Sequence, residues 1–442
     1  MKIRGLLISA AVALTMAPPA MAERASDGNV SIIYWQAPSI LNPYLSGGTK
    51  DVESSSLVIE PLGRYDQTGA LVAYLAESIP TVENGGVSAD LTSITWTLKK
   101  GLKWSDGSPV TSADVKFTAD YCMHPDMGCA QLAGFDGIKS IDIVDDLTVT
   151  VNFTAPKPNP YGPFMGGQSP IIQKAQFESC MGAKAPECTE QNFGPIGTGP
   201  FVVTDFRPND VIQYKANENY RDPAKPAFAT VTFKGGGDAT GAGRAVLETG
   251  EFDYAWNLQL APDVIAKMEE GGKGVAIAGF GPLVERLEMN MTDPSPDLDA
   301  DTRSTRKAPH PFLSDINVRK ALSMAIDRVL LTEIGYGKAG FPTCDLVPAP
   351  DLYAAKNDHC LTQDIAGANA LLDSAGWKKG GDGVRSKDGV RLSILYQTST
   401  NAVRQDFQAL IKEWWSQIGV ETELRNLNAS VFFGGDPGSP DT

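Results

Sequence analysis

The sequence predicts an α/β protein of two or three domains. Its 442 residues are enough for that number of domains. Trp96–Lys99 alternates large and polar residues, as a half-buried strand does, whereas Val318–Ile326 carries apolar residues at helical spacing. The stretch Trp96–Thr118 combines both kinds of element, because a strand, two turn dipeptides and a capped helix start follow one another. Strands and helices are therefore expected in one chain.

Composition and charge favour a globular protein that does not bind nucleic acid. Hydrophobic residues make up 42% of the chain and charged residues 21%, which is ordinary for a globular protein. The formal net charge is −15. A negative surface of this size supports solubility and repels a polyphosphate backbone, so no nucleic-acid partner is expected.

Residues 1–22 read as a secretory signal peptide. Lys2 and Arg4 form a charged end, Gly5 to Met16 is apolar, and Ala20-Met21-Ala22 is a small-x-small cleavage site. A membrane anchor is disfavoured because a span needs about 20 apolar residues. No cysteine lies near the cleavage point, so lipid attachment is not indicated. The sequence predicts a secreted protein in the periplasm.

The six cysteines are expected to form three local disulfides in an oxidising compartment. They occur as near neighbours in the pairs Cys122 and Cys129, Cys180 and Cys188, and Cys344 and Cys360. Proximity alone supports this choice among the 15 pairings that six cysteines allow. A metal site at Cys122, His124 and Cys129 is the alternative. Its spacing is not usual for zinc and no fourth ligand is evident, so no metal or other cofactor is expected.

Four motifs in order resemble one protein family. The stretch 99–117 reads KxGLKWSDGxPVTxxDVxF, with Thr111 as helix N-cap and Asp114 at the N3 position. GTGPF with a later NxxY, then PFxxDxxVRxAxxxAIDR and AxxLLDxAGW, follow further along the chain. Together they resemble the family 5 extracellular solute-binding proteins of ABC importers, the peptide- and nickel-binding group. The resemblance extends from about residue 30 to residue 434.

The resemblance implies a two-lobed periplasmic-binding-protein fold of the large cluster C type, with an extra α/β subdomain in lobe I. The chain is expected to stop within lobe II, before the segment that meets the ligand's amino end in the family, and therefore to bind ligand weakly. The expected division is 1–22 signal peptide, 23–62 first part of lobe I, 63–195 accessory subdomain, 196–255 second part of lobe I, and 256–442 lobe II.

The same resemblance suggests ligand contacts at three places on the cleft between the lobes. These are the loop after the strand at 30–35, the crossover after residue 255, and the end of the strand at 392–398. The candidate residues are Trp35, Gln36, Ser39, Trp256, Asn257, Tyr396 and Gln397. Burial in the core is the alternative for Trp35 and Trp256, and exposure to solvent is the alternative for Asn257.

The expected function is that of a binding protein, not an enzyme. The resemblance implies a monomer that captures oligopeptides or dipeptides and delivers them to an ABC permease in the inner membrane. A nickel chelate, an opine or an oligosaccharide is the alternative solute. A secreted hydrolase is disfavoured because the sequence has neither GxSxG nor HExxH. Its histidines, His124, His310 and His359, are not placed as a general base.

Overall fold

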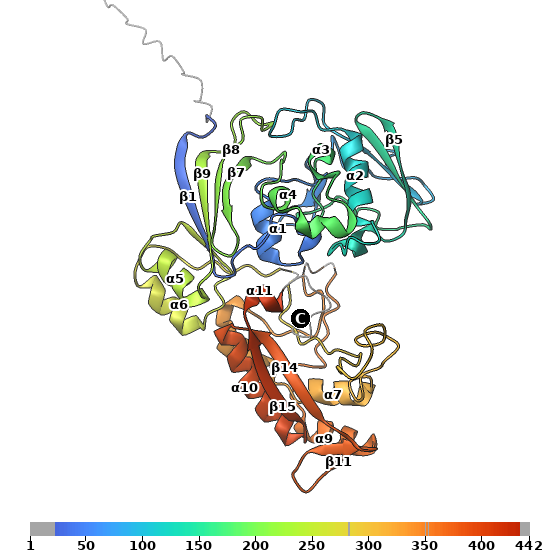
Figure 1. The fold of residues 1–442 in the computed structure, drawn as a ribbon. Coiled ribbons are helices and arrows are strands. Elements are labelled where there is room, and N and C mark those ends of the chain that lie inside the picture. Colours follow the sequence, from blue (N-terminus) through green and yellow to red (C-terminus); the bar gives the residue numbers. More distant parts are fainter. Residues whose placement is uncertain (1–22, 282, 350, 352, 434–442) are drawn as a thin grey trace, which may run out of the picture.

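The chain folds into two lobes that lie one above the other in Figure 1. The computed structural model describes residues 23–281, 283–349, 351 and 353–433, so the predicted signal peptide lies outside the described residues. The upper lobe contains the elements up to α6 (Pro262–Glu269), and the lower lobe those from α7 (Ile316–Met324) to β15 (Glu421–Leu427), whereas Ala429 of α11 (Ala429–Phe432) packs in an upper-lobe core. Within the described part of the chain, no helix has the length and apolar character needed to cross a membrane.

A five-stranded sheet organises the upper lobe, in the order β10-β1-β9-β8-β7. The interior strand β1 runs parallel to both of its neighbours, β9 and β10, whereas β7, β8 and β9 are antiparallel neighbours. The strands are β1 (Asp27–Tyr34), β7 (Phe201–Arg207), β8 (Val211–Ala216), β9 (Phe228–Gly235) and β10 (Tyr254–Trp256). Parallel pairing places the carboxyl ends of β1 and β10 at the same edge, which faces the lower lobe (Figure 1).

The two faces of this sheet carry separate cores, because successive side chains along a strand point to opposite faces. On one face Tyr34 packs with Ile212, Tyr214 and Phe233, and with residues that follow α1 (Thr49–Ser55). On the other face Ile33 and Trp35 pack with α5 (Ala239–Leu247) and α6. Leu260 and Met268 belong to this second core. They lie beyond the predicted division at residue 256, and we propose that the upper lobe extends to α6.

The region 63–195 has a sheet and core of its own. The sheet order is β4-β6-β5, with β4 (Ser93–Thr97), β5 (Ile138–Asp145) and β6 (Thr148–Phe153). Helix α2 (Ser112–Cys122) starts where the sequence places it, and the Asp114 carboxylate accepts the Thr111 backbone N–H at 2.9 Å. The smaller elements of this region are β2 (Gly63–Tyr65), β3 (Leu71–Ala73), η2 (Leu132–Phe135), α3 (Lys174–Phe177), η3 (Gly182–Glu187) and α4 (Thr189–Phe193). The short helix η1 (Pro43–Leu45) precedes the region and contributes Tyr44 to its core.

The lower lobe is built around a parallel pair of strands joined by one helix. β14 (Ser393–Ser399) and β15 (Glu421–Leu427) pair in parallel, and α10 (Ala402–Gln417) connects them. Phe407, Ile411 and Trp415 of α10 share a core with Val318 and Leu322 of α7. The other elements are α8 (Arg328–Gly335), η4 (Gly337–Ala339), α9 (Ile365–Ser374), β11 (Lys378–Lys379), β12 (Arg385–Lys387) and β13 (Val390–Arg391).

The sequence also predicts a strand at 284–291, and this prediction is wrong. These residues have no strand pairing in the structure. Leu287 and Met289 pack against the lower core, whereas the residues between them are exposed. The alternation of apolar and polar residues therefore arises because one side of this extended segment is buried and the other is exposed. A strand also needs a hydrogen-bonded neighbour, which the sequence pattern does not reveal.

The cysteines form three disulfides, in the pairs that proximity predicted: Cys122–Cys129, Cys180–Cys188 and Cys344–Cys360. The first pairing removes both thiols of the alternative metal site. Among the described residues, no group of three or more metal-binding side chains is present.

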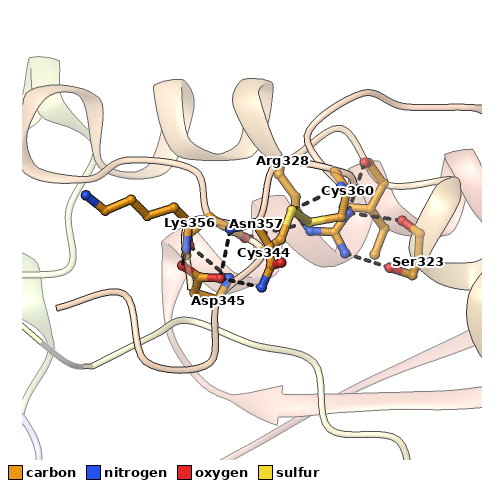
Figure 2. Close-up of a disulfide and its surroundings, with 9 residues drawn as sticks. Ser323, Arg328, Cys344, Asp345, Lys356, Asn357 and Cys360 are labelled. Atoms are coloured by element: carbon orange, nitrogen blue, oxygen red, sulfur yellow. Dashed lines mark hydrogen bonds between the residues drawn. A yellow bond between two sulfur atoms is a disulfide. The ribbon is translucent and has the colours of Figure 1, made fainter. Parts of the chain in front are cut away.

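The third disulfide closes a loop in the lower lobe (Figure 2). The Asp345 carboxylate accepts the backbone N–H groups of Lys356 and Asn357 at 2.7 and 3.1 Å. Arg328, in turn, donates to the carbonyl of Cys360 at 3.1 Å and to the hydroxyl of Ser323 at 2.9 Å. The disulfide is thereby fixed to the start of α8.

Candidate functional site

Two aromatic rings stack at the edge of the upper sheet that faces the lower lobe. Tyr34 and Trp256 are paired residues on β1 and β10. Their ring centroids are 4.8 Å apart and their planes differ by 8°. Trp256 is only partly buried, so part of its indole remains accessible. The exposed part of the Trp256 indole, backed by the buried Tyr34 ring, is the aromatic surface at this edge.

A carboxylic acid adjoins this stack. The Tyr34 hydroxyl donates to Glu53 Oε2 at 2.5 Å, and Glu53 belongs to α1. Burial raises the pKa of Glu53, although the hydrogen bond from Tyr34 opposes the rise. Tyr254 lies two residues before Trp256, is 51% exposed, and has a pKa raised by burial and by the charge of Glu53. We call Tyr34, Glu53, Tyr254 and Trp256 the edge cluster.

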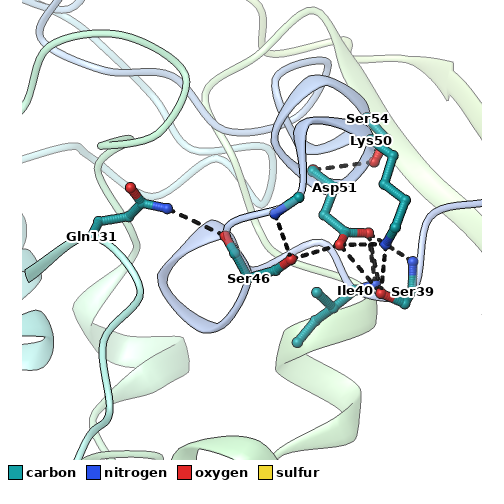
Figure 3. A network of polar contacts seen from close by, with 8 residues as sticks. Ser39, Ile40, Ser46, Lys50, Asp51, Ser54 and Gln131 are labelled. Atoms are coloured by element: carbon teal, nitrogen blue, oxygen red, sulfur yellow. Dashed lines mark hydrogen bonds and ion pairs between the residues drawn. The ribbon is translucent and has the colours of Figure 1, made fainter. Parts of the chain in front are cut away.

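The predicted contact Ser39 is held in a buried polar network (Figure 3). Asp51 is fully buried, and its carboxylate accepts the Ser39 backbone N–H at 2.7 Å and the Ser46 hydroxyl at 2.7 Å. Lys50, 3% exposed, forms an ion pair with Asp51 at 2.7 Å and donates to the Ser39 hydroxyl at 2.9 Å. The network fixes the loop 39–46 against α1.

The structure places Trp35 in the core. Its side chain is 5% exposed, and its indole N–H donates to the Asn257 carbonyl at 2.9 Å. Gln36 is buried as well, whereas Asn257 is exposed with a left-handed φ of 53°. Trp35 and Trp256 thus lie on opposite faces of the sheet. In this conformation the structure brings Trp256, but not Trp35, to an accessible surface.

The predicted contacts of the lower lobe lie on β14. Tyr396 points into the core, where its ring lies 5.8 Å from that of Trp415. Gln397 is partly buried, and its side-chain Oε1 is buried without a hydrogen-bond partner among the described residues. A buried amide oxygen with no donor is costly, so this atom suits a donor from a bound molecule or water.

A polar cluster that the sequence did not reveal connects the lobes near the end of β14. Arg404 contacts Glu285 through Nε at 2.9 Å and through Nη2 at 3.1 Å, and Tyr336 donates to Glu285 at 3.0 Å. Asn401 donates to Gln259 of the upper lobe at 2.5 Å. Burial, followed by the charge of Glu285, raises the pKa of Tyr336. The partners are far apart in the sequence, and no local motif marks them.

The described cavities lie away from the predicted contacts. One of about 210 Å³ is lined by α5, α6, α8 and α10. Another, of about 660 Å³, lies beside β15 and the 382–384 turn. None of the seven predicted ligand contacts lines either cavity. The edge cluster also lines neither of these two cavities.

Comparison with known proteins gives a family match over most of the chain. The model of the family described as "Bacterial extracellular solute-binding proteins, family 5 Middle" matches residues 70–437. Protein XP55 of Streptomyces lividans is 28% identical over 397 residues, 89% of this chain and 66% of its own. The glutathione-binding protein GsiB of Escherichia coli (strain K12) is 23% identical over 390 residues, 88% of this chain and 67% of its own. The chain spans about two thirds of the length of these relatives.

Solved structures confirm the two-lobed α/β fold. The oligopeptide-binding protein AppA from Bacillus subtilis, in complex with a nonapeptide, has a TM-score of 0.72 at 23% identity, over 92% of this chain and 76% of its own. NikZ from Campylobacter jejuni, in complex with Ni(L-His), has a TM-score of 0.70 at 23% identity, over 91% of this chain and 74% of its own. AgaA from A. tumefaciens R10, in complex with agropinic acid, has a TM-score of 0.73 at 21% identity, over 91% of this chain and 73% of its own.

Proposed function

The chain belongs to the family 5 bacterial extracellular solute-binding proteins, and from this membership we propose that it captures a peptide between its lobes and delivers it to an ABC permease. A relative named for glutathione, itself a peptide, and a structural neighbour in complex with a nonapeptide support the peptide assignment. The proposal includes export through the N-terminal signal peptide, and a monomeric state.

The edge cluster is the observation that carries this proposal. The Trp256 ring, supported from behind by the buried Tyr34 ring, provides a flat apolar surface, and Glu53 supplies a carboxyl group beside it. A peptide offers what this surface can hold: apolar side chains for the rings, and amide or ammonium N–H groups for the carboxyl group. On the opposite lobe, Gln397 Oε1 lacks a donor and is buried in this conformation, so it would accept a peptide N–H only after its side chain becomes exposed.

Capture requires the lobes to close around the peptide. Closure is a population shift, so the peptide must bind the closed arrangement more tightly than the open one. Moving a pair of states from 1% closed to 99% closed takes about 5.5 kcal/mol of differential binding. The free energy for that shift would come from contacts on both lobes, which the edge cluster and Gln397 provide.

Native mass spectrometry of the purified protein tests the solute class. Because the family resemblance implies weak binding by this chain, we expect only a small population of masses above that of the free chain, with peptides among the small molecules released by denaturation. Protein that has been unfolded, washed and refolded is the control and should have lost these masses. Recovery of metal chelates, opines or sugars in place of peptides would overturn the peptide assignment, while leaving the family membership intact.

A further inference from the structure

A cavity lies between the lobes on the sheet face opposite the edge cluster. Its volume is about 210 Å³. Leu260 and Val264 contribute from the upper lobe, and Ile334, Val403 and Phe407 from the lower lobe. Leu260 and Val264 pack in the same core as Trp35, whereas Tyr34 and Trp256 pack on the other face of the sheet. The cavity and the edge cluster are therefore separate places.

The lining of this cavity suits an uncharged apolar molecule. Its lining is mainly aliphatic and aromatic, and it opens to solvent beside the exposed residues Thr240, Ile334, Ala402 and Asp406, of which only Asp406 is charged. Benzene and xenon are uncharged apolar molecules that occupy enclosed apolar cavities of about 150 Å³, and their size is the relevant comparison for this more open cavity. At about 210 Å³ this cavity has room for a molecule of at least that size.

Direct contacts between the lobes border the cavity. Gly337 approaches α6 so closely that a Cβ there would lie 2.7 Å from Pro262 Cγ. Near the start of α10, Asn401 bonds to Gln259 across the junction. α6 and the start of α10 lie on the same side of the junction between the lobes (Figure 1). Because both lobes supply walls, any change in the angle between them changes the shape of the cavity.

We propose that this cavity is a second ligand site, which takes a small uncharged apolar molecule and couples its binding to the angle between the lobes. The edge cluster and the cavity lie on opposite faces of one sheet, so a rotation that brings the lobes together at the edge cluster separates the cavity walls. A molecule that holds the walls apart favours that rotation. By linkage, closure at the edge cluster changes the affinity of the cavity by the same factor.

Xenon and benzene test the proposal on the full chain, without any knowledge of the transported solute. In crystals pressurised with xenon, we expect a xenon atom among Leu260, Val264 and Phe407. In solution, benzene should lower the radius of gyration measured by small-angle X-ray scattering. An empty cavity under xenon would overturn the site. Benzene bound with an unchanged radius of gyration would overturn the coupling. Neither result depends on which solute is transported.

Two substitutions that fill the cavity from opposite lobes test whether xenon and benzene act at this cavity. Ala402→Leu adds volume from α10, and Val264→Phe adds volume from α6. Each should abolish xenon occupancy and the response to benzene, and each should itself lower the radius of gyration. Ala409→Leu is the matched control, because Ala409 is also an exposed alanine on α10 but does not line the cavity. Loss of xenon in this control would contradict the assignment. The wild-type measurements stand even if a filling variant fails to fold.

Discussion

Tyr34 and Trp256 occupy paired positions on adjacent parallel strands and stack with nearly parallel rings 4.8 Å apart. The hydroxyl of Tyr34 is held by Glu53 of α1, so the stack is fixed from the strand side and from the helix side. A ring pair fixed in this way loses little side-chain freedom when a ligand packs on it. Such pre-organisation suits one wall of a binding cleft.

Trp256→Ala is expected to weaken peptide binding at least tenfold with a smaller effect on folding. The indole is partly exposed, and its loss removes the aromatic surface offered to the peptide. Isothermal titration calorimetry with a peptide recovered from the purified protein measures the affinity. Unchanged affinity in the variant would remove the edge cluster from the binding surface.

Trp35→Ala is the matched comparison, because Trp35 is a tryptophan of the same sheet with the opposite environment. It is buried and its N–H is bonded, so truncation should cost about 3–5 kcal/mol of the free energy of unfolding, measured with urea. A Trp35→Ala protein as stable as the wild type would contradict its placement in the core.

Glu53 should make the stability of the protein depend on pH. Burial raises the pKa of Glu53 in the folded protein above its usual 4.5. Between that value and the folded pKa, the folded state holds more protons than the unfolded state, so the free energy of unfolding falls as the pH rises through this window. Glu53→Gln removes the titration and keeps an acceptor for Tyr34.

The wild-type and Glu53→Gln proteins are unfolded with urea at a series of pH values from about 4 to 8. The free energy of unfolding of the wild type minus that of the variant should decrease as the pH rises above 4.5, and then level off. A difference that does not change with pH would show that the Glu53 carboxyl group has an ordinary pKa in the folded protein.

Asp51→Asn should destabilise the upper lobe. The substitution leaves the ammonium group of Lys50 buried without its counter-charge, and breaking a buried pair in this way costs about 3–5 kcal/mol. The double variant Lys50→Met/Asp51→Asn should lose less than Asp51→Asn alone, because no lone charge remains. Asp126→Asn, at an exposed aspartate, is the control and should unfold like the wild type.

Arg385→Met should destabilise the lower lobe by about 3 kcal/mol, because it leaves buried acceptors without donors. Arg385 is 1% exposed and donates to the carbonyls of Trp377 and Ile418 at 2.6 and 2.8 Å. Arg391→Met is the control from the adjacent strand, where the ion pairs are exposed and worth about 0–1 kcal/mol. Equal losses in the two variants, measured by urea unfolding, would contradict the difference in burial.

Elements with strong local signals could be predicted from the sequence. The capping pattern at Thr111 and Asp114 located α2, and short spacing identified the disulfide partners. These features depend on residues close together in the chain. The strand predicted at 284–291 is absent for the opposite reason. A strand needs a hydrogen-bonded neighbour, which comes from a distant part of the chain, and the local sequence does not specify it.

The candidate site was only partly predictable for the same reason. Trp256 was identified, but its partners Tyr34 and Glu53 come from other elements and carry no motif. No pattern in the sequence marks Lys50 and Asp51 as buried, yet the structure buries both. Trp35 and Trp256 look alike in the sequence, and only the pairing of β1 with β10 assigns them to opposite faces of the sheet.

The disulfides have a consequence for how the chain matures. Their partners are 7, 8 and 16 positions apart, so each bond can form as soon as a short segment enters an oxidising compartment. No correct bond has to wait for a distant part of the chain, and each lobe can be cross-linked before the other has emerged. No disulfide joins the lobes, since all six cysteines are used within one lobe or the other. Oxidation therefore stiffens each lobe while leaving the junction free to bend.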